Sequence, residues 1–353
     1  MGQFAVRFYR GENLSLFLLG AGFNVDAGRL RTPYRSECSY PLVTDVARLC
    51  FDIALSEIPS GKSIEDLFWD SQQRHENAPM KRLTEKLMEA DYYLAWKLAD
   101  AGQSNCYRDF FETFSGANFL TFNYDSLAEI FLFRTARWYP EDGYGVQVTA
   151  ELMSEAALPA NRKSASKVIH LHGSHCLRPS SFETYQKPGD RFPSLSLRAR
   201  PVYNFDPDCL SPLFSPYRRV LPDASYKMTY DRVIAPVPNK ATELEQPFVR
   251  EVYEVAHSMV SARGELIAVG YSFNRHDSSS YSTILRALAA SHDRRLVLVS
   301  PQAGAIKAQI SAEFPNLRIE PIAKTFKGWA ADSFHVPRRQ RQMGYLSSPS
   351  TTI

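Results

Sequence analysis

The stretch LFLLGAGFNVDAG, from Leu16 to Gly28, decides the fold that the sequence predicts. Its four consecutive apolar residues, Leu16 to Leu19, are typical of a short strand that is covered on both faces, as in a parallel sheet. The strand runs directly into Gly20-Ala21-Gly22, and glycines let a backbone approach a phosphate without a Cβ in the way. Val25 occupies the place of the third glycine in the dinucleotide-binding fingerprint, so this stretch alone also fits a tight turn after a strand.

Apolar runs of the same kind recur along the chain, with helical patterns between them. Leu83, Leu87, Leu94 and Leu98 are spaced 4, 7 and 4 residues apart, which places them on one face of a helix. Strands that alternate with helices predict an α/β fold with a Rossmann-like parallel sheet flanked by helices. The other runs predicted as strands are Phe119 to Phe122, Val168 to Leu171, Val233 to Ala235, Leu266 to Val269 and Leu296 to Val299.

Two stretches depart from this alternation, and we expect both to belong to one domain of residues 1–335. Residues from about 40 to 112 separate the first two strands by more than a crossover needs, and they are expected to form a helical insertion. Residues from about 175 to 231 are rich in Pro, Ser, Arg and Tyr, and they are expected to form a loop-rich excursion over the sheet. The basic and polar residues 336–353 are predicted to be a flexible tail.

The composition excludes several classes of protein. The chain has 353 residues with 41 basic and 38 acidic side chains, and its net charge of +3 does not predict direct nucleic-acid binding. No apolar run approaches the length of a membrane span, and the N-terminus lacks a secretory stretch. The five cysteines form no C-x-x-C pair, so we expect no zinc site built from paired thiolates, and no other metal is expected. Their odd number also argues against a disulfide framework, so a cytoplasmic location is expected.

Three further polar motifs follow predicted strands. They are TFNYD (Thr121 to Asp125), HLHGS (His170 to Ser174) and GYSFNRHD (Gly270 to Asp277). Each alone also fits an ordinary strand-to-helix loop, and Asp125 is as well suited to capping a helix as to contacting a ligand. Because the carboxyl ends of parallel strands meet at one edge of a sheet, the four motifs together predict a single crevice.

The histidines of the third motif are candidates for proton transfer. On an alternating strand His170 and His172 point the same way. A lone histidine is more often a packed or capping residue, but His172 stands at a strand end before a glycine, and imidazole exchanges a proton near neutral pH. Two histidines without a nearby acidic ligand pattern make a weak metal site.

In this order the four motifs resemble the sirtuin-like superfamily, across residues 20–277. GAGFNVDAG, followed by Pro33 to Arg35, is similar to the phosphate-and-ribose loop, TFNYD to the T-x-N-x-D segment, HLHGS to the His-Gly and GYS to a later Gly-x-Ser. The chain lacks the paired C-x-x-C zinc module of the deacylases. Phe122 replaces the glutamine of T-Q-N-x-D, and Asn24 replaces the usual serine. These departures resemble the sirtuin-like NAD hydrolases of bacterial anti-phage defence.

The resemblance implies that NAD is the substrate and that its nicotinamide–ribose bond is cleaved to give nicotinamide and ADP-ribose. It implies that Asn123 orients the ribose or the attacking water and that His172 accepts a proton. Backbone N–H groups of Gly20, Ala21 and Gly22 would meet the diphosphate, and Asp125 and Asp277 would meet sugar hydroxyls or fix their loops. The remaining residues expected to bind NAD are Phe23, Asn24, Asp26, Thr121, Gly270, Tyr271 and Ser272.

The resemblance also bears on partners and on two rival functions. A freely active NAD hydrolase would drain its own cell, so a homo-oligomer or a co-encoded sensor or activator protein is expected to gate the activity. One rival is a protein deacylase that has lost its zinc. The other is a non-catalytic sensor of an NAD-derived signal, against which the presence of both Asn123 and His172 argues.

Overall fold

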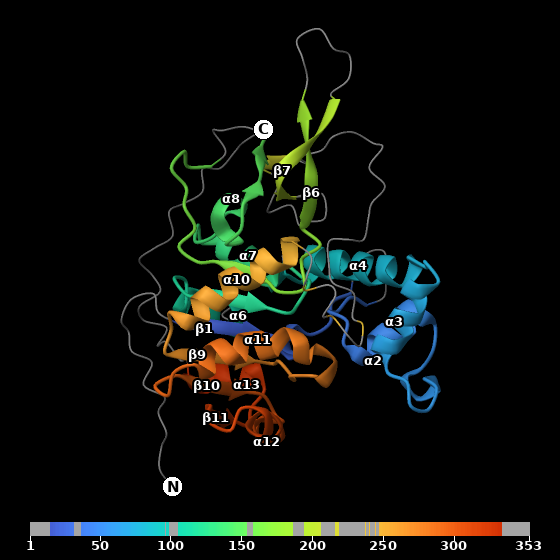
Figure 1. Ribbon diagram of the computed structural model, residues 1–353, viewed down its shortest axis with the longest axis vertical. Coiled ribbons are helices and arrows are strands. Elements are labelled where there is room, and N and C mark those ends of the chain that lie inside the picture. The colour runs from blue at the N-terminus through green and yellow to red at the C-terminus, as the bar shows by residue number, and fades with distance from the viewer. Residues whose placement is uncertain are drawn as a thin grey trace.

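The computed structural model describes residues 15–31, 37–95, 97–98, 105–153, 158–185, 194–205, 216–218, 237, 240, 244 and 247–333. Its centre is a six-stranded sheet in the order β11-β10-β9-β1-β2-β5, in which every neighbouring pair is parallel. The predicted α/β fold with a parallel sheet is therefore confirmed (Figure 1). The strands are β1 (Leu16–Leu19), β2 (Asn118–Thr121), β5 (Val168–His170), β9 (Glu265–Val269), β10 (Arg295–Val299) and β11 (Arg318–Ile322).

β1 lies inside the sheet, and all four of its residues are buried. Phe17 is in register with Phe119 of β2 on one side and with Ile267 of β9 on the other. The chain moves outward from β1 through β2 to β5 and then returns to β9, so the direction of winding reverses between β1 and β9. In open α/β sheets such a reversal creates a crevice at the carboxyl ends of the strands.

Helices cover both faces of the sheet. α6 (Cys106–Thr113) packs against α7 (Leu127–Arg134) and α13 (Phe326–Ser333), while α10 (Pro247–Ser261) packs against α11 (Ser278–Ala289). Right-handed crossovers in opposite winding directions place α6 and α11 on opposite faces. α12 (Ala303–Glu313) packs against β10 and β11. Phe110 of α6 meets Phe17 and Phe119 with ring centroids 5.0 and 6.0 Å apart, which forms the aromatic core under one face.

A group of helices between β1 and β2 lies beside the sheet (Figure 1). It consists of α2 (Val43–Phe51), α3 (Ile64–Gln73), α4 (Ala78–Ala90) and the π-helical turn Asp91–Ala95. Ser63 begins α3 with a capping box, in which its hydroxyl accepts the Asp66 N–H and the Asp66 carboxylate accepts the Ser63 N–H. Of the four leucines predicted on one helix face, Leu83, Leu87 and Leu94 are buried and Leu98 is half-buried. The insertion was expected to extend to about residue 112, but α6 packs with the helices that cover the sheet.

The expectation of a loop-rich excursion is wrong for much of its described part. β6 (Leu177–Tyr185) and β7 (Ser194–Phe205) form a long antiparallel hairpin, seen at the top of Figure 1, with a register shift between Ser180 and Phe182. The segment SLSLRA of β7 alternates with the period of a strand, but prolines in both strands obscure that pattern. The shorter elements are α1 (Ala21–Asn24), α8 (Pro140–Gly143), β3 (Val148–Thr149), β4 (Glu151–Leu152) and β8 (Tyr217–Arg218).

One strand of the sheet was not predicted, and one predicted strand is not tested. β11 escapes the sequence reading because RIEPI is a half-exposed edge strand that contains Pro321, not a continuous apolar run. The run predicted at Val233 to Ala235 lies outside the described residues, as do the residues Pro33 to Arg35 and the tail.

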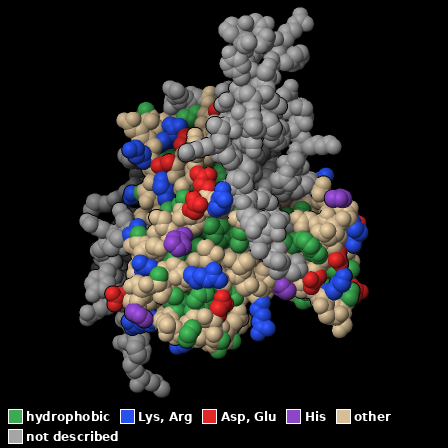
Figure 2. Space-filling model, in the orientation of Figure 1, with side chains coloured by type: hydrophobic (Ala, Val, Ile, Leu, Met, Phe, Trp, Pro, Cys, Tyr) green, Lys and Arg blue, Asp and Glu red, His purple; other side chains and the backbone are tan. Residues whose placement is uncertain are grey.

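The surface matches the nearly balanced charge of the chain. On the face shown in Figure 2, basic and acidic side chains are interspersed among polar and apolar ones. Among the residues that the structure describes, no helix has both the length and the apolar character needed to cross a membrane.

Candidate functional site

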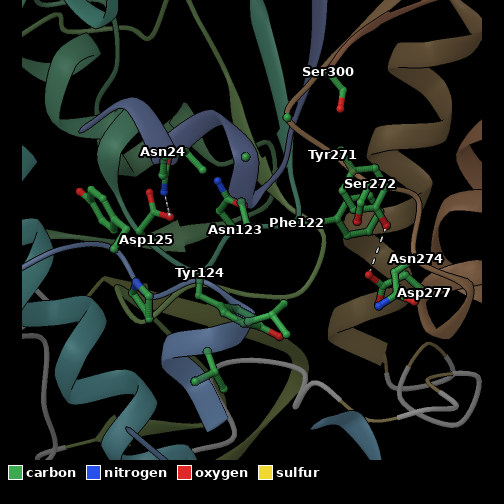
Figure 3. Close-up of a pocket in the computed structure, with 18 of the residues that line it drawn as sticks. Asn24, Phe122, Asn123, Tyr124, Asp125, Tyr271, Ser272, Asn274, Asp277 and Ser300 are labelled. Carbon is green, nitrogen blue, oxygen red and sulfur yellow. Dashed lines mark hydrogen bonds between the residues drawn. The ribbon is translucent and has the colours of Figure 1, made fainter. Parts of the chain in front are cut away.

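A cavity of about 480 Å³ lies at the carboxyl edge of the sheet, where the winding reverses. The loops after β1, β2, β5, β9, β10 and β11 line it on the side of the sheet, and α2, α3 and α4 line it on the other. Figure 3 shows Asn24, Asn123 and Asp125 near one end and Tyr271, Asn274 and Asp277 near the other.

Most of the residues proposed from the sequence line this cavity, and they come from all four motifs. Those that do are Ala21, Gly22, Asn24, Asp26, Asn123, Asp125, His172, Gly270, Tyr271, Ser272 and Asp277. Gly20, Phe23 and Thr121 lie behind the wall. Phe23 packs in the aromatic core, 4.4 Å from the ring of Phe326, and the other two residues anchor Asn123.

The glycines of the first and fourth motifs contact each other. The N–H of Gly20 donates to the Val269 carbonyl at 3.1 Å, and that of Gly22 donates to the Gly270 carbonyl at 2.8 Å. Gly270 has φ = +65°, and a Cβ on it would lie 2.1 Å from the Phe23 nitrogen. The expectation that the N–H groups of Gly20 and Gly22 reach a diphosphate is wrong for this conformation, because both are already used.

Asn123 is fixed at three points of its structure. Its backbone N–H donates to the Thr121 hydroxyl at 2.9 Å, and its side-chain Nδ2 donates to the Gly20 carbonyl at 3.1 Å. Its own carbonyl lies 3.0 Å from Nδ1 of His170. The residue therefore lines the cavity in a conformation that the loop after β1 and the end of β5 both determine.

His172 is an uncharged imidazole in the cavity wall. Its ring meets Phe122 edge-on at 4.7 Å, Phe122 stacks on Tyr271 at 4.4 Å, and its Nε2 lies 3.3 Å from the Ser280 hydroxyl. Burial, together with the neighbouring ammonium of Lys240, holds the pKa of His172 well below its ordinary value. At neutral pH the ring is therefore neutral, with a lone pair on one ring nitrogen, and its low pKa makes it a weak base.

His170 does not share the surroundings of His172, contrary to the expectation from strand alternation. β5 ends at His170, so the alternation does not continue to His172. The His170 ring turns away to Glu129, with Nε2 2.5 Å from Oε1. Burial alone would lower the pKa of His170, but the Glu129 carboxylate and the Asn123 carbonyl raise it above its ordinary value.

The sequence left open whether Asp125 caps a helix, contacts a ligand or fixes its loop, and its contacts in the structure are of the first and third kinds. Its Oδ1 accepts the Leu127 N–H at the start of α7, and its Oδ2 accepts the Asn24 amide at 2.6 Å (Figure 3). Burial and the nearby Asp91 raise the pKa of Asp125 to about 7, against the opposing effect of these hydrogen bonds. Both carboxylate oxygens are thus held within the protein.

Asp277 is held by a buried cation that sequence reasoning missed. It forms an ion pair with Lys240, whose side chain is 3% exposed, and it accepts the Tyr271 hydroxyl at 3.4 Å (Figure 3). Lys240 is not among the residues that the sequence assigns to the site, and the folded chain places it beside Asp277. Asp26 likewise fixes the chain, because its carboxylate accepts the Lys327 N–H at the start of α13.

Several other lining residues were also missed. Ser300 to Gln302 follow β10 and Lys324 to Phe326 follow β11, so their positions at strand ends were a usable signal. The insertion contributes Tyr40 and Glu65, and Glu65 accepts the Asn274 amide at 2.9 Å. Within the described part of the chain, no group of three His, Cys, Asp or Glu side chains is placed to hold a metal ion.

Neither protein-family models nor curated proteins give a match to this chain. Among solved structures, it is similar to a Sir2 homologue in complex with 2′-O-acetyl ADP ribose, with 14% identity over 90% of this chain and 89% of that chain and a TM-score of 0.41. A Sir2 homologue–NAD complex is 14% identical over 91% and 88% of the two chains, with a TM-score of 0.38. A Sir2 homologue mutant in complex with ADP ribose is 13% identical over 94% and 95%, with a TM-score of 0.39.

Proposed function

We propose that this chain is an NAD hydrolase that cleaves the nicotinamide–ribose bond to give nicotinamide and ADP-ribose. The observation that supports this most is that Asn123 and an uncharged His172, in the loops that follow the neighbouring strands β2 and β5, line one cavity at the carboxyl edge of the sheet. The motifs that carry these two residues are those that resemble the sirtuin-like superfamily.

Cleavage of this bond requires the protein mainly to position the ribose and the water and to accept a proton. The ring nitrogen of nicotinamide is cationic in NAD, so it takes the bonding electron pair and leaves as a neutral molecule. Water attacks the anomeric carbon of the ribose and gives its proton to His172, while the Asn123 amide orients the water or the ribose. General-base help of this kind accelerates a reaction by roughly 100- to 10,000-fold.

The two walls of the cavity suit a ligand that has both an aromatic ring and polar sugars. The insertion presents a largely apolar surface, and the loops of the sheet present amides, carboxylates and an imidazole. The apolar residues of that surface are Pro41, Val43, Val46, Ile64, Leu83 and Leu87. A planar nicotinamide ring packs well on such a surface, while ribose hydroxyls find hydrogen-bond partners opposite.

The direct test is incubation of the purified protein with NAD, followed by chromatography of the products. Nicotinamide and ADP-ribose in equal amounts are the expected result. A cyclic product would change the reaction class, and binding of NAD without turnover would favour a sensor. Release of O-acetyl-ADP-ribose from an acetylated peptide would favour a deacylase.

We further propose that assembly gates the activity and that the setting is NAD depletion in bacterial anti-phage defence, which the motif resemblance supports. The insertion offers contact surface, because Trp69 and Tyr92 on it are each 45% exposed. Light scattering and NAD turnover, measured across protein concentration and with a co-encoded partner, test the gating. A monomer with full, concentration-independent activity would rule it out.

A further inference from the structure

Two buried histidine–carboxylate pairs hold the loop that carries Asn123 from behind the cavity. His170 pairs with Glu129 of α7, and His175 pairs with Asp91 of the insertion at 2.6 Å. All four side chains are at most 1% exposed, and none of them lines the cavity. The second pair fixes the end of the loop, because Asp91 also accepts the backbone N–H and the hydroxyl of Ser126.

The first pair acts on Asn123 itself. A carbonyl oxygen only accepts hydrogen bonds, so the 3.0 Å contact between His170 Nδ1 and the Asn123 carbonyl requires a proton on Nδ1. The Glu129 carboxylate also only accepts hydrogen bonds, so its 2.5 Å contact with Nε2 places a proton on that nitrogen too, and Glu129 fixes the orientation of a doubly protonated ring. Without His170, the peptide between Asn123 and Tyr124 would lose a donor that the described structure gives it.

We propose that His170 and Glu129 are a positioning pair for the reaction, in which His170 holds the Asn123 carbonyl so that the Asn123 side chain keeps its place in the cavity wall. This inference rests on the proposed NAD hydrolysis. Neither side chain lines the cavity, so the pair does not contribute to ligand binding directly. Its effect is on the orientation of Asn123 in the transition state. Loss of the pair is therefore expected to lower kcat and to leave KM nearly unchanged.

Two amide substitutions of His170 separate this role from simple packing. The amide nitrogen of His170→Asn takes the place of Nδ1 and still donates to the Asn123 carbonyl. The amide of His170→Gln takes the place of Nε2 and faces Glu129 instead. We expect kcat within about threefold of the unaltered protein for His170→Asn and a loss of about 10- to 100-fold for His170→Gln.

The measurements are kcat and KM for NAD, calorimetric binding of ADP-ribose, and hydrogen exchange of the amides at residues 122–126. His170→Gln should raise exchange in that segment and leave β9 and β10 unchanged, with KM and the ADP-ribose Kd within about threefold. His292→Gln, at an exposed position, is the matched control. Equal kcat in the two His170 variants, or a rise in KM that accounts for the loss, would overturn the proposal.

Glu129→Gln gives a second test that does not depend on the folding of His170→Gln. The amide nitrogen of this isostere donates to Nε2 of a neutral ring and keeps the proton on Nδ1, so kcat should stay within about threefold. A loss of about 100-fold would show that the charge of the pair matters rather than the hydrogen bond to the Asn123 carbonyl, and would overturn the proposal. If the unaltered protein does not cleave NAD, the proposed function fails. Hydrogen exchange then decides whether the pair holds the loop, and unchanged exchange at residues 122–126 in His170→Gln would refute it.

Discussion

The backbone N–H of Gly22 donates to the carbonyl of Gly270 at 2.8 Å, which joins the loops after β1 and β9 where the sheet reverses its winding. The approach leaves no room for side chains, since a Cβ on Gly22 would lie 2.7 Å from that same carbonyl oxygen. The glycines of the two motifs are therefore needed to bring the loops together at one end of the cavity.

Replacement of Gly270 by alanine should destabilise the protein strongly. Its φ of +65° is unfavourable for alanine, and the new Cβ would lie 2.1 Å from the Phe23 nitrogen, so the free energy of unfolding should fall by at least about 2 kcal/mol. Gly304→Ala is the control, because Gly304 lies within α12 with open space around it and should gain about 0.5–1 kcal/mol. Urea unfolding measures both variants. Equal effects would show that the close contact is unimportant.

Asn123→Ala and His172→Ala should each reduce NAD cleavage by at least about 100-fold while the protein keeps its fold. The reason is that one side chain orients the reactants and the other accepts the proton. Product chromatography gives the rates, and circular dichroism checks the fold. Asn161→Ala and His292→Ala, at exposed positions away from the cavity, serve as matched controls. Near-normal turnover in either site variant would remove that residue from the mechanism.

The carboxyl of Asp125 should make stability fall as the pH rises towards neutrality. Burial, followed by the repulsion from Asp91, raises the pKa of Asp125 from its ordinary 3.8 to about 7. The folded protein therefore binds this proton more tightly than the unfolded chain does, and stability declines between those two values and levels off above about pH 7. Urea unfolding from pH 4.5 to 8.5 should show that this slope is smaller in Asp125→Asn.

Asp293→Asn, at an exposed position, is the control for that measurement, and it should keep the slope of the unaltered protein. Parallel stability curves for Asp125→Asn and the unaltered protein would mean that Asp125 does not titrate in this range.

The ion pair of Lys240 and Asp277 should matter far more than a surface pair. Lys240→Met leaves a carboxylate that is only 17% exposed without its cation, so the free energy of unfolding should fall by about 3 kcal/mol at pH 7. Adding Asp277→Asn should recover part of this loss. Lys324→Met is the control, since its pair with Asp332 is 47% and 59% exposed and should contribute under about 1 kcal/mol. Similar losses in both lysine variants would contradict the assignment.

The sequence predicts the sheet and the position of the cavity for a simple physical reason. Strands buried on both faces are continuous apolar runs, as in Leu16 to Leu19, and the polar loops that follow them must meet at one edge. Leu83, Leu87 and Leu94 gave the helix of the insertion in the same way, because burial imposes the period of a helix on the sequence.

The partners of the site residues could not be predicted, because they come from distant positions in the chain. His170 lies 41 residues from Glu129, and Lys240 lies 37 residues from Asp277, so no local pattern connects either pair. The prediction that the Gly20 and Gly22 N–H groups meet a diphosphate failed for a related reason. A close approach of two loops and a close approach to a phosphate both need a missing Cβ, and only the folded structure tells them apart.

The apolar wall that α2 and α4 present to the cavity separates two roles within the molecule, the size of the cavity and the chemistry of its reacting groups. The reacting groups stand on the sheet, whereas the width of the space opposite them depends on Val46, Leu83 and Leu87 of the insertion. Size and chemistry are therefore encoded in separate stretches of sequence. Enlarging or shrinking side chains along α2 and α4 offers a route to retune which molecules the protein admits, while the groups that would transform them stay untouched.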